Sequence, residues 1–316
     1  MAVHLHRSVY RILAALLICI ALAACADTDS GKKEYDVTRV SVILPHNDDG
    51  YWSNVIAGLY DGIEEYGEAY HLDVQISIPQ LNYSIPQMTD LLRQQIAAQV
   101  DMIVIQGNED EEFQAVLEDA QGAGILILCI DTQMEDFPYD IYIGSDNYAA
   151  GRLIGEELAL LTEGACSVVV ISGEEDYLNL EQRLEGFKDV IAEYPEIHLV
   201  DLLYDEYDGL TFLKYYDEYA SEADALVCLE GTGGLAIYNQ MNSRGDNYEV
   251  IVGFDATEAI PAGLIDGVVA QEEREMGRRM IGEIADYVSE GHFSSQEIYT
   301  DILWLTADNY DEVMGE

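Results

Sequence analysis

Polar and aromatic side chains follow several apolar runs of the chain, where a run of strand length gives way to a loop, and one more lies on a predicted helix. Some carry planar rings, and the others carry carboxylate, amide or guanidinium groups that donate or accept hydrogen bonds. These residues are Tyr51, Trp52, Asp131, Arg183, Tyr207, Glu230, Asp255 and Gln271. Aromatic rings pack against the C–H faces of sugars, and the polar groups suit pairs of adjacent hydroxyls. The set therefore predicts a site for a polyol.

Each of these residues also has a structural interpretation. Tyr51 and Trp52 could close a core at the start of a helix, and Asp131 and Asp255 could cap the helices that follow them. Arg183 could form a surface ion pair. The loop of Tyr207 could align one residue away, since the chain has 22 tyrosines.

The elements that must position these side chains alternate between strand and helix. Apolar runs of strand length are 40–44, 74–78, 102–105, 125–130, 141–143, 168–171, 199–203, 225–229, 250–252 and 268–270. Segments of 10–20 residues at helical spacing separate them, as in Val55, Leu59 and Ile63. Wholly apolar strands between helices predict parallel sheets covered on both faces, with ligands at the carboxyl ends of the strands. About ten strands with a break near residue 145 predict two doubly wound lobes.

Six short motifs occur in the order and at the spacing of a known family. They are Tyr51-Trp52, Asp131, Ile143-Gly144-Ser145-Asp146-Asn147, Arg183 four residues before Phe187, Val252-Gly253-Phe254-Asp255, and Ala270-Gln271 with Gly277 six residues on. Together they resemble the type I periplasmic solute-binding proteins of the ribose/galactose kind, which feed sugar ABC transporters. The resemblance runs from about Val40 to Leu305.

The resemblance implies a fold and a set of ligand contacts. It implies two Rossmann-like lobes with three crossings, near Ser145, near Asp255–Gln271, and near Thr300. The expected lobes are 39–145 with 272–300 and 146–271 with 301–316. By the resemblance, the first lobe would supply Tyr51, Trp52 and Asp131, and the second Arg183, Tyr207 and Asp255, with Gln271 on a hinge strand. Three residues of the loops after strands complete the expected ligand-binding set, namely Asp49, Thr132 and Glu230.

Two positions depart from the ribose pattern. Thr132 stands where the family commonly has Arg, and Glu230-Gly231 stands where it often has Asn-Asp. One guanidinium is lost and one carboxylate is gained, so the site is more acidic. This leaves open another pentose, a hexose, a polyol or an amino-bearing ligand.

The N-terminus is typical of export. Arg7 and Arg11 precede a short apolar run, and Leu22-Ala23-Ala24-Cys25 resembles a bacterial lipobox. Residues 1–24 are therefore expected to be a signal peptide, with Cys25 lipidated and 25–38 a polar tether. An ordinary signal peptide is the alternative. The expected location is extracytoplasmic, on the outer face of the cell membrane.

Charge and composition exclude other classes. The 316 residues hold 61 Asp and Glu against 14 Lys and Arg, for a net charge of −47, which argues against nucleic-acid binding. Cys129, Cys166 and Cys228 lie in apolar runs and are interpreted as buried thiols. Paired carboxylates can cleave glycosides, but no acid is marked as a proton donor. No His-rich or Ser-His-Asp pattern accompanies them. We therefore expect a binding protein without metal or cofactor, not an enzyme.

The predicted function is capture of a monosaccharide-like solute between two lobes and its delivery to an ABC transporter permease, with the protein as a monomer. One alternative is a receptor that presents its sugar-closed form to a membrane histidine kinase. Another is a binder of a non-sugar ligand such as a nucleoside.

Overall fold

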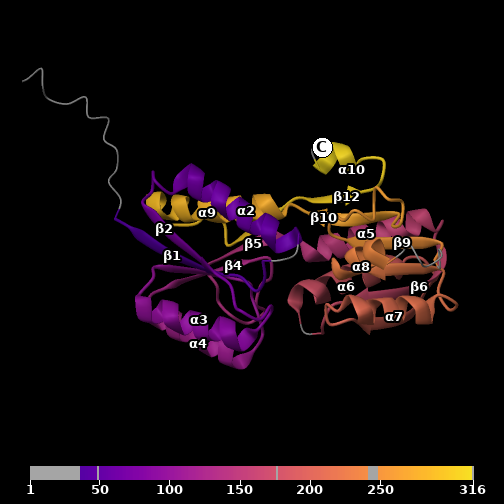
Figure 1. Ribbon diagram of the computed structural model, residues 1–316, viewed down its shortest axis with the longest axis horizontal. Coiled ribbons are helices and arrows are strands. Elements are labelled where there is room, and N and C mark those ends of the chain that lie inside the picture. Colours follow the sequence, from indigo (N-terminus) through magenta and orange to yellow (C-terminus); the bar gives the residue numbers. More distant parts are fainter. Residues whose placement is uncertain (1–35, 48–49, 176, 241–247, 315–316) are drawn as a thin grey trace, which may run out of the picture. The chain divides into compact units, whose positions relative to one another are not determined.

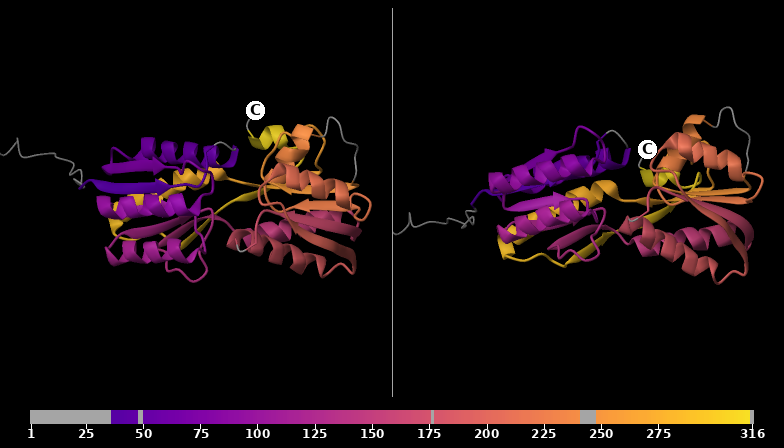
Figure 2. Two further views of the ribbon diagram at one scale, coloured as in Figure 1. Left: turned by 60° about the horizontal axis from the view of Figure 1, so that its bottom comes forward. Right: turned by 90° about the horizontal axis from the view of Figure 1, so that it is seen from below.

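Strands and helices alternate along the chain as the apolar runs predict. The computed structural model describes residues 36–47, 50–175, 177–240 and 248–314. Within these ranges, twelve strands form two six-stranded sheets, both in the unit Val37–Glu316. Helices cover both faces of each sheet (Figures 1 and 2). The predicted α/β class with two doubly wound lobes is confirmed. The predicted signal peptide, Cys25 and nearly all of the predicted tether lie outside the described residues.

The N-terminal lobe is built on the sheet β11-β5-β4-β3-β1-β2, whose strands are all parallel. Its strands are β1 (Thr38–Ile43), β2 (Leu72–Ser77), β3 (Met102–Ile105), β4 (Leu126–Ile130), β5 (Ile141–Ser145) and β11 (Glu297–Thr300). Its helices are α2 (Gly50–Tyr66), α3 (Ile85–Ala98), α4 (Glu111–Gly122) and α9 (Glu273–Glu290). Figure 1 shows α2 beside α9 on one face of the sheet and α3 beside α4 on the other.

The C-terminal lobe repeats this plan on the sheet β12-β10-β9-β8-β6-β7. Its strands are β6 (Ala165–Ser172), β7 (Glu196–Tyr204), β8 (Ala225–Cys228), β9 (Val250–Phe254), β10 (Gly267–Gln271) and β12 (Ile302–Leu305). Its helices are α5 (Asn147–Leu161), α6 (Leu178–Ile191), α7 (Gly209–Tyr219), α8 (Thr232–Gln240) and α10 (Tyr310–Met314). The helix pairs α5–α6 and α7–α8 cover opposite faces.

Two strands were not among the predicted apolar runs. Strands β11 and β12 have four residues each, and β12 pairs antiparallel with β10 although the prediction was of parallel strands. Both lie at sheet edges, and only the residues of β11 that face inward are buried. Runs this short give too little periodicity to be recognised in the sequence.

Alternation along the strands divides each lobe's core into two layers. In β1 and β3, Val42 and Val104 pack toward α2 and α9, whereas Ile43 and Ile103 pack toward α3 and α4. Successive strand residues point to opposite faces, so strands covered on both sides must be apolar throughout.

Glycines allow the paired helices in each lobe to touch backbone to backbone. A Cβ on Gly58 of α2 would lie 1.8 Å from the carbonyl oxygen of Arg274 in α9. A Cβ on Gly151 of α5 would lie 1.9 Å from the carbonyl oxygen of Arg183 in α6. Only glycine permits either approach, and the second crossing sets the position of a predicted site residue.

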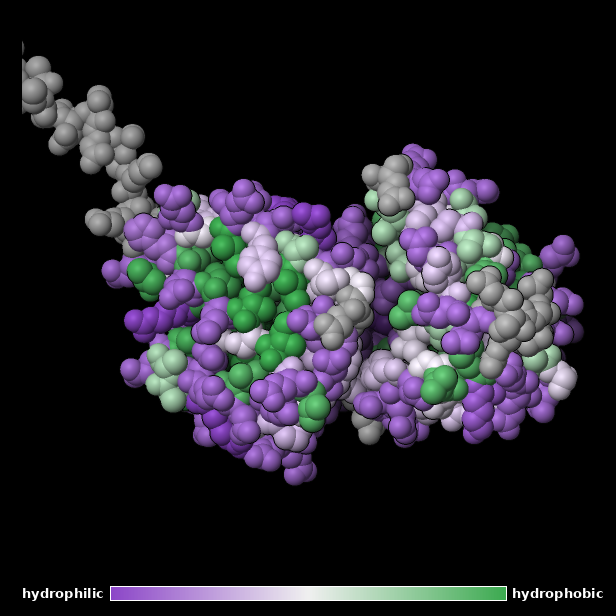
Figure 3. Space-filling model, viewed as in Figure 1, coloured by the Kyte–Doolittle hydropathy of each residue, from purple (hydrophilic) through white to green (hydrophobic). Residues whose placement is uncertain are grey.

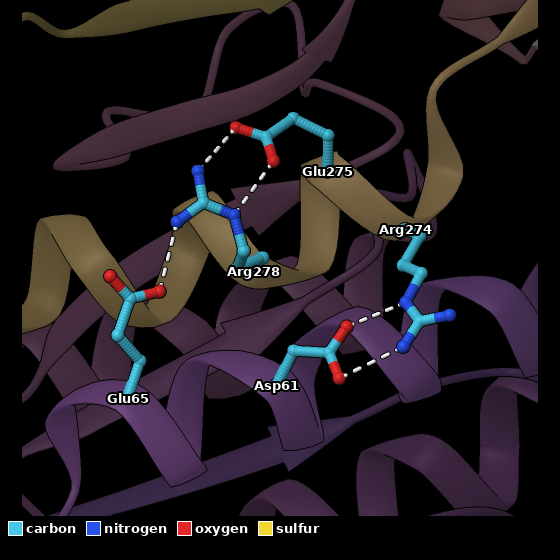
Figure 4. A network of polar contacts seen from close by, with 5 residues as sticks. All are labelled: Asp61, Glu65, Arg274, Glu275 and Arg278. Carbon is cyan, nitrogen blue, oxygen red and sulfur yellow. Dashed lines mark hydrogen bonds and ion pairs between the residues drawn. The ribbon is translucent and has the colours of Figure 1, made fainter.

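Ion pairs lie on the outer side of the α2–α9 contact. Arg274 forms a bidentate pair with Asp61, and Arg278 contacts Glu275 at 2.8 Å and Glu65 at 3.1 Å (Figure 4). These side chains are partly or largely exposed, so each pair contributes little to stability. Hydrophilic residues cover much of the surface drawn in Figure 3, as the excess of acidic residues requires.

The chain passes between the lobes at three places. The passages join β5 to α5, β10 to α9 and β11 to β12. Among the described residues, no helix has the length and apolar character needed to cross a membrane.

Candidate functional site

The candidate site residues lie where parallel strands end. In the N-terminal lobe, Gln106 follows β3 and Asp131 follows β4. In the C-terminal lobe, Asp255 follows β9, Gln271 ends β10, and Glu230 lies two residues beyond β8. The carboxyl ends of parallel strands share one edge of a sheet, so each lobe presents a row of polar groups.

The carboxylate of Asp131 accepts hydrogen bonds from three side chains. The Tyr51 hydroxyl donates to Oδ1, the Gln106 amide donates to Oδ2 at 2.8 Å, and the Thr132 hydroxyl donates to Oδ2 at 2.6 Å. The residue is buried, and its φ of 68° aims it out of the strand direction. Burial and the Asp131 charge raise the pKa of Tyr51, so this phenol stays neutral and keeps its proton. The carboxylate is thus held in one orientation before any ligand arrives.

Arg183 is buried in α6, with 3% of its surface exposed. Its Nε donates to Oδ1 of Asn147 at 2.9 Å, and its Nη1 donates to the carbonyl oxygen of Leu229 at 2.9 Å. The guanidinium carbon lies 3.6 Å from the centre of the Phe254 ring. These contacts use two of the five N–H donors of an arginine, so the fork is fixed while other donors remain for a ligand.

A short chain of hydrogen bonds links two of the passages between the lobes. The Ser145 hydroxyl, at the end of β5, donates to Oε1 of Gln271 at 2.8 Å. The Gln271 amide donates in turn to Oδ1 of Asp255 at 2.9 Å. Asp255 has a φ of 62°, like Asp131 at the corresponding strand end of the other lobe. In both lobes, therefore, the aspartate that follows this strand has a left-handed backbone conformation.

Tyrosine rings from both lobes meet face to face. Tyr83, in the loop after β2, stacks on Tyr207 with ring centres 5.5 Å apart and planes 7° apart. His46 stacks on Tyr83 at 5.4 Å, and Tyr177 meets Tyr207 edge-on at 6.3 Å. Burial and nearby Tyr177 and Glu230 raise the pKa of Tyr207. These flat neutral rings are suited to pack on a sugar.

Trp52 does not join these rings. It is 2% exposed and lies in the core with Val55 and Leu59, which share its face of α2. Its indole Nε1 donates to the Tyr83 hydroxyl at 3.2 Å. The structure thus gives Trp52 the position of a core residue that helps to hold Tyr83, whereas the Tyr51 hydroxyl donates to the Asp131 carboxylate.

Glu230 and Thr132 are both buried at the site. Glu230 accepts from the backbone N–H of Thr232 at 2.8 Å at the start of α8, and burial raises its pKa. Thr132 donates to Asp131, as described above, and its hydroxyl accepts a hydrogen bond from the Gln106 amide at 3.2 Å. Asp49 lies outside the described residues.

Several side chains at the site were missed by the sequence interpretation. They are Tyr83, Gln106, Tyr177, Asp205 and Glu273. Gln106 directly follows a predicted strand, so the signal that identified Asp131 would have found it. Tyr83 and Tyr177 lie farther from the strand ends, and their loops bring them to the site.

Metal and thiol chemistry find no support in the described ranges. No group of three His, Cys, Asp or Glu side chains there could hold a metal ion. Cys129, Cys166 and Cys228 are free and buried, and burial raises the pKa of each thiol. These thiols are far from the reactive thiolate state.

Comparisons with known proteins agree with this architecture. A D-apiose import binding protein from Actinobacillus succinogenes is 20% identical over 91% of this chain and 92% of its own length. A glucose-galactose binding protein from Geobacillus stearothermophilus superposes with a TM-score of 0.78 at 24% identity, over 87% of this chain and 99% of that one. A solute-binding protein from Burkholderia graminis, solved with D-arabinose, gives 0.79 at 21% identity, over 88% and 98%.

The relatives named here are binding proteins. The family model described as "Periplasmic binding protein domain" matches residues 40–291, which include both sheets apart from their short last strands and the start of β1. With this match, the resemblance inferred from six short motifs is confirmed, and the chain belongs to the periplasmic binding protein family.

Proposed function

We propose that this protein is an extracytoplasmic solute-binding protein of an ABC transporter and captures a monosaccharide-sized solute. The observation that carries the proposal is that each lobe holds one charged group in a fixed orientation. Asp131 is held by Tyr51 and Gln106 in one lobe, and Arg183 is held by Asn147 and Leu229 in the other. A carboxylate and a guanidinium with fixed directions suit a ligand with several adjacent hydroxyls.

The stacked tyrosines support the same class of ligand. Tyr83 and Tyr207 come from different lobes and lie parallel. A solute with one flat apolar face and a polar rim would contact rings and hydrogen-bonding groups at once. Binding of this kind favours the arrangement in which both lobes contact the ligand, and a partner can recognise that arrangement.

The proposed partner is a membrane permease. Lipidation of Cys25 would keep the protein at the membrane surface, and the polar segment 25–38 would act as its tether. Since the family is that of periplasmic binding proteins, an extracytoplasmic location follows from membership.

The test is a thermal-shift panel of pentoses, hexoses and polyols on residues 33–316. A ligand at one hundred times its Kd stabilises a protein by about 2.7 kcal/mol, which such a scan detects. We expect a shift with one sugar and its loss in Asp131→Ala. Asp73→Ala is the matched control, because Asp73 is exposed on the edge strand β2.

Two results would contradict the proposal. Unchanged affinity in Asp131→Ala would remove the site, since that carboxylate lies at its centre. If no compound of the panel raises the unfolding temperature of the folded protein, a non-sugar ligand such as a nucleoside would be favoured.

A further inference from the structure

Three carboxylates lie just beyond the carboxyl ends of strands of the C-terminal sheet, in which β8 pairs with β9 and β6 lies between β8 and β7. Asp205 directly follows β7, Glu230 comes two residues after β8, and Asp255 directly follows β9. Asp205 was not among the residues singled out from the sequence. Asp205 distinguishes this site from a site for a neutral polyol, because the fold itself offers no hydrogen-bond donor to its second carboxylate oxygen among the described residues.

Asp205 is completely buried, with 0% of its surface exposed. Its Oδ1 accepts the backbone N–H of Tyr207 at 3.0 Å, which fixes the turn that carries the Tyr207 ring. Its Oδ2 is buried and has no hydrogen-bond partner among the described residues. Leaving a buried charged acceptor unsatisfied is costly, so such an atom needs an explanation.

The surroundings of Asp205 are acidic. Burial and then the charge of Glu230 raise the pKa of Asp205, and Asp208 adds to this while the Tyr207 N–H opposes it. Both carboxylates also raise the pKa of the Cys228 thiol, although burial is the larger cause. A buried carboxylate whose proton affinity is raised by a second carboxylate is suited to receive a cation.

Further acids stand next to this pair. Asp255 raises the pKa of Glu230, although burial is the larger cause, and Thr232 and Arg183 act in the opposite direction. Burial and Asp255 raise the pKa of Glu273, at the start of α9, to about 8. The electrostatic potential at these strand ends is therefore negative, with contributions from Asp255 and Glu273 as well as from Asp205 and Glu230.

Arg183 lowers the pKa of Glu230 through its charge but forms no ion pair with either acid in the described part of the chain. Its Nε and Nη1 are occupied by Asn147 and the carbonyl oxygen of Leu229. Among the described residues, no Lys or Arg nitrogen lies within 4 Å of the carboxylate of Asp205 or Glu230. Arg183 is one cation near several acids, so much of their negative charge is left unbalanced.

We propose that the solute carries a protonated amino group and that Asp205 and Glu230 receive it. This rests on the proposed function and narrows its ligand to amino sugars or amino polyols. An ammonium group donates three hydrogen bonds and brings one positive charge. It would satisfy the free Oδ2 of Asp205 and relieve the repulsion between the two acids. A hydroxyl could do only the first.

Isothermal titration with matched pairs tests the ligand class. The pairs are D-glucosamine with D-glucose, D-galactosamine with D-galactose, and 1-amino-1-deoxysorbitol with sorbitol. We expect the amino member of one pair to bind at least tenfold more tightly, equal to about 1.4 kcal/mol. A neutral member that binds as tightly as its amino partner, or more tightly, would overturn this inference and leave the sugar-binding function standing. If none of these compounds binds, the result would count against both the amino-ligand inference and the proposed sugar-binding function.

The number of protons released on ligand binding distinguishes an ionised Asp205 from a protonated one in the complex. A cationic ligand favours the ionised carboxylates, so binding should release protons, and affinity should rise with pH while the amine stays protonated. Titration in phosphate and in Tris buffer measures this release. A neutral solute that accepts a hydrogen bond from protonated Asp205 would release none, and that result would contradict the proposal.

Asp205→Asn tests the residue itself. An asparagine keeps the acceptor for the Tyr207 N–H, so the turn is preserved while the charge is lost. We expect affinity for the amino ligand to fall at least tenfold and affinity for its neutral partner to stay within twofold. Asp73→Asn is the control on an exposed strand residue. An unchanged preference in Asp205→Asn would refute the assignment, and Glu230→Gln repeats the test if the first variant does not fold.

Discussion

Gly151→Ala is the perturbation that ties the fold most directly to the site. Gly151 lies in α5 where this helix crosses α6, and an added Cβ would sit 1.9 Å from the carbonyl oxygen of Arg183 and 2.6 Å from its carbonyl carbon. Carbon atoms attract at about 3.5–4.0 Å, so the helices must move apart by about 1 Å or more. The displaced residue is Arg183, whose guanidinium is held in a fixed orientation at the site.

The expected magnitude has two parts. Overpacking of a close contact costs about 1–3 kcal/mol, and the higher helix propensity of alanine returns up to about 1 kcal/mol. A net loss of about 1–2 kcal/mol would lower Tm by roughly 2–3 °C in a protein of this size. Movement of α6 would also pull Arg183 away from the Leu229 carbonyl oxygen, so ligand affinity should fall at least tenfold.

Urea unfolding followed by circular dichroism measures the stability, and titration calorimetry measures the affinity. Gly122→Ala is the matched control, because Gly122 ends α4 and nothing would lie within 4 Å of its Cβ. The control should be as stable as the parent protein or slightly more stable, with unchanged affinity. If Gly151→Ala unfolds within about 0.5 kcal/mol of the parent and binds equally well, the close crossing does not position Arg183.

Three further predictions concern charge. Glu273→Gln should leave stability unchanged near pH 4. It should raise stability by a few kcal/mol at pH 9, because a carboxyl with a native pKa of about 8 destabilises the fold increasingly between its unfolded pKa and that value; thermal unfolding across pH checks this, and a constant difference would refute it. Arg183→Lys should cost about 1–3 kcal/mol in urea unfolding and weaken binding at least tenfold, since an ammonium cannot donate to Asn147 and Leu229 while stacking on Phe254. Added salt should raise Tm, because a net charge of −47 repels itself, and a flat response between about 10 and 150 mM salt would exclude this effect.

The two-lobed fold could be predicted from the sequence because its signals are local. Wholly apolar runs of strand length between amphipathic helices allow few arrangements other than covered parallel sheets. The same regularity placed Asp131, Asp255 and Gln271 at strand ends. The structure has each of them there, with a hydrogen bond to another candidate residue.

The position of the aromatic rings depended on packing. Trp52, Val55 and Leu59 repeat at helical spacing and share a buried face, which the sequence pattern could have indicated. Tyr83 reaches Tyr207 only because a loop of one lobe meets a loop of the other, and no local pattern encodes a contact between residues so far apart in the chain.

The sequence by itself determined the order of strands and helices, the family and the side chains available at the strand ends, because these depend on periodicity and on neighbours along the chain. The tertiary structure alone decided which polar groups are already satisfied. Asp131 has three donors, whereas Asp205 keeps one buried oxygen without a partner among the described residues. That difference arises from burial and from contacts between distant segments, and the choice of ligand depends on it.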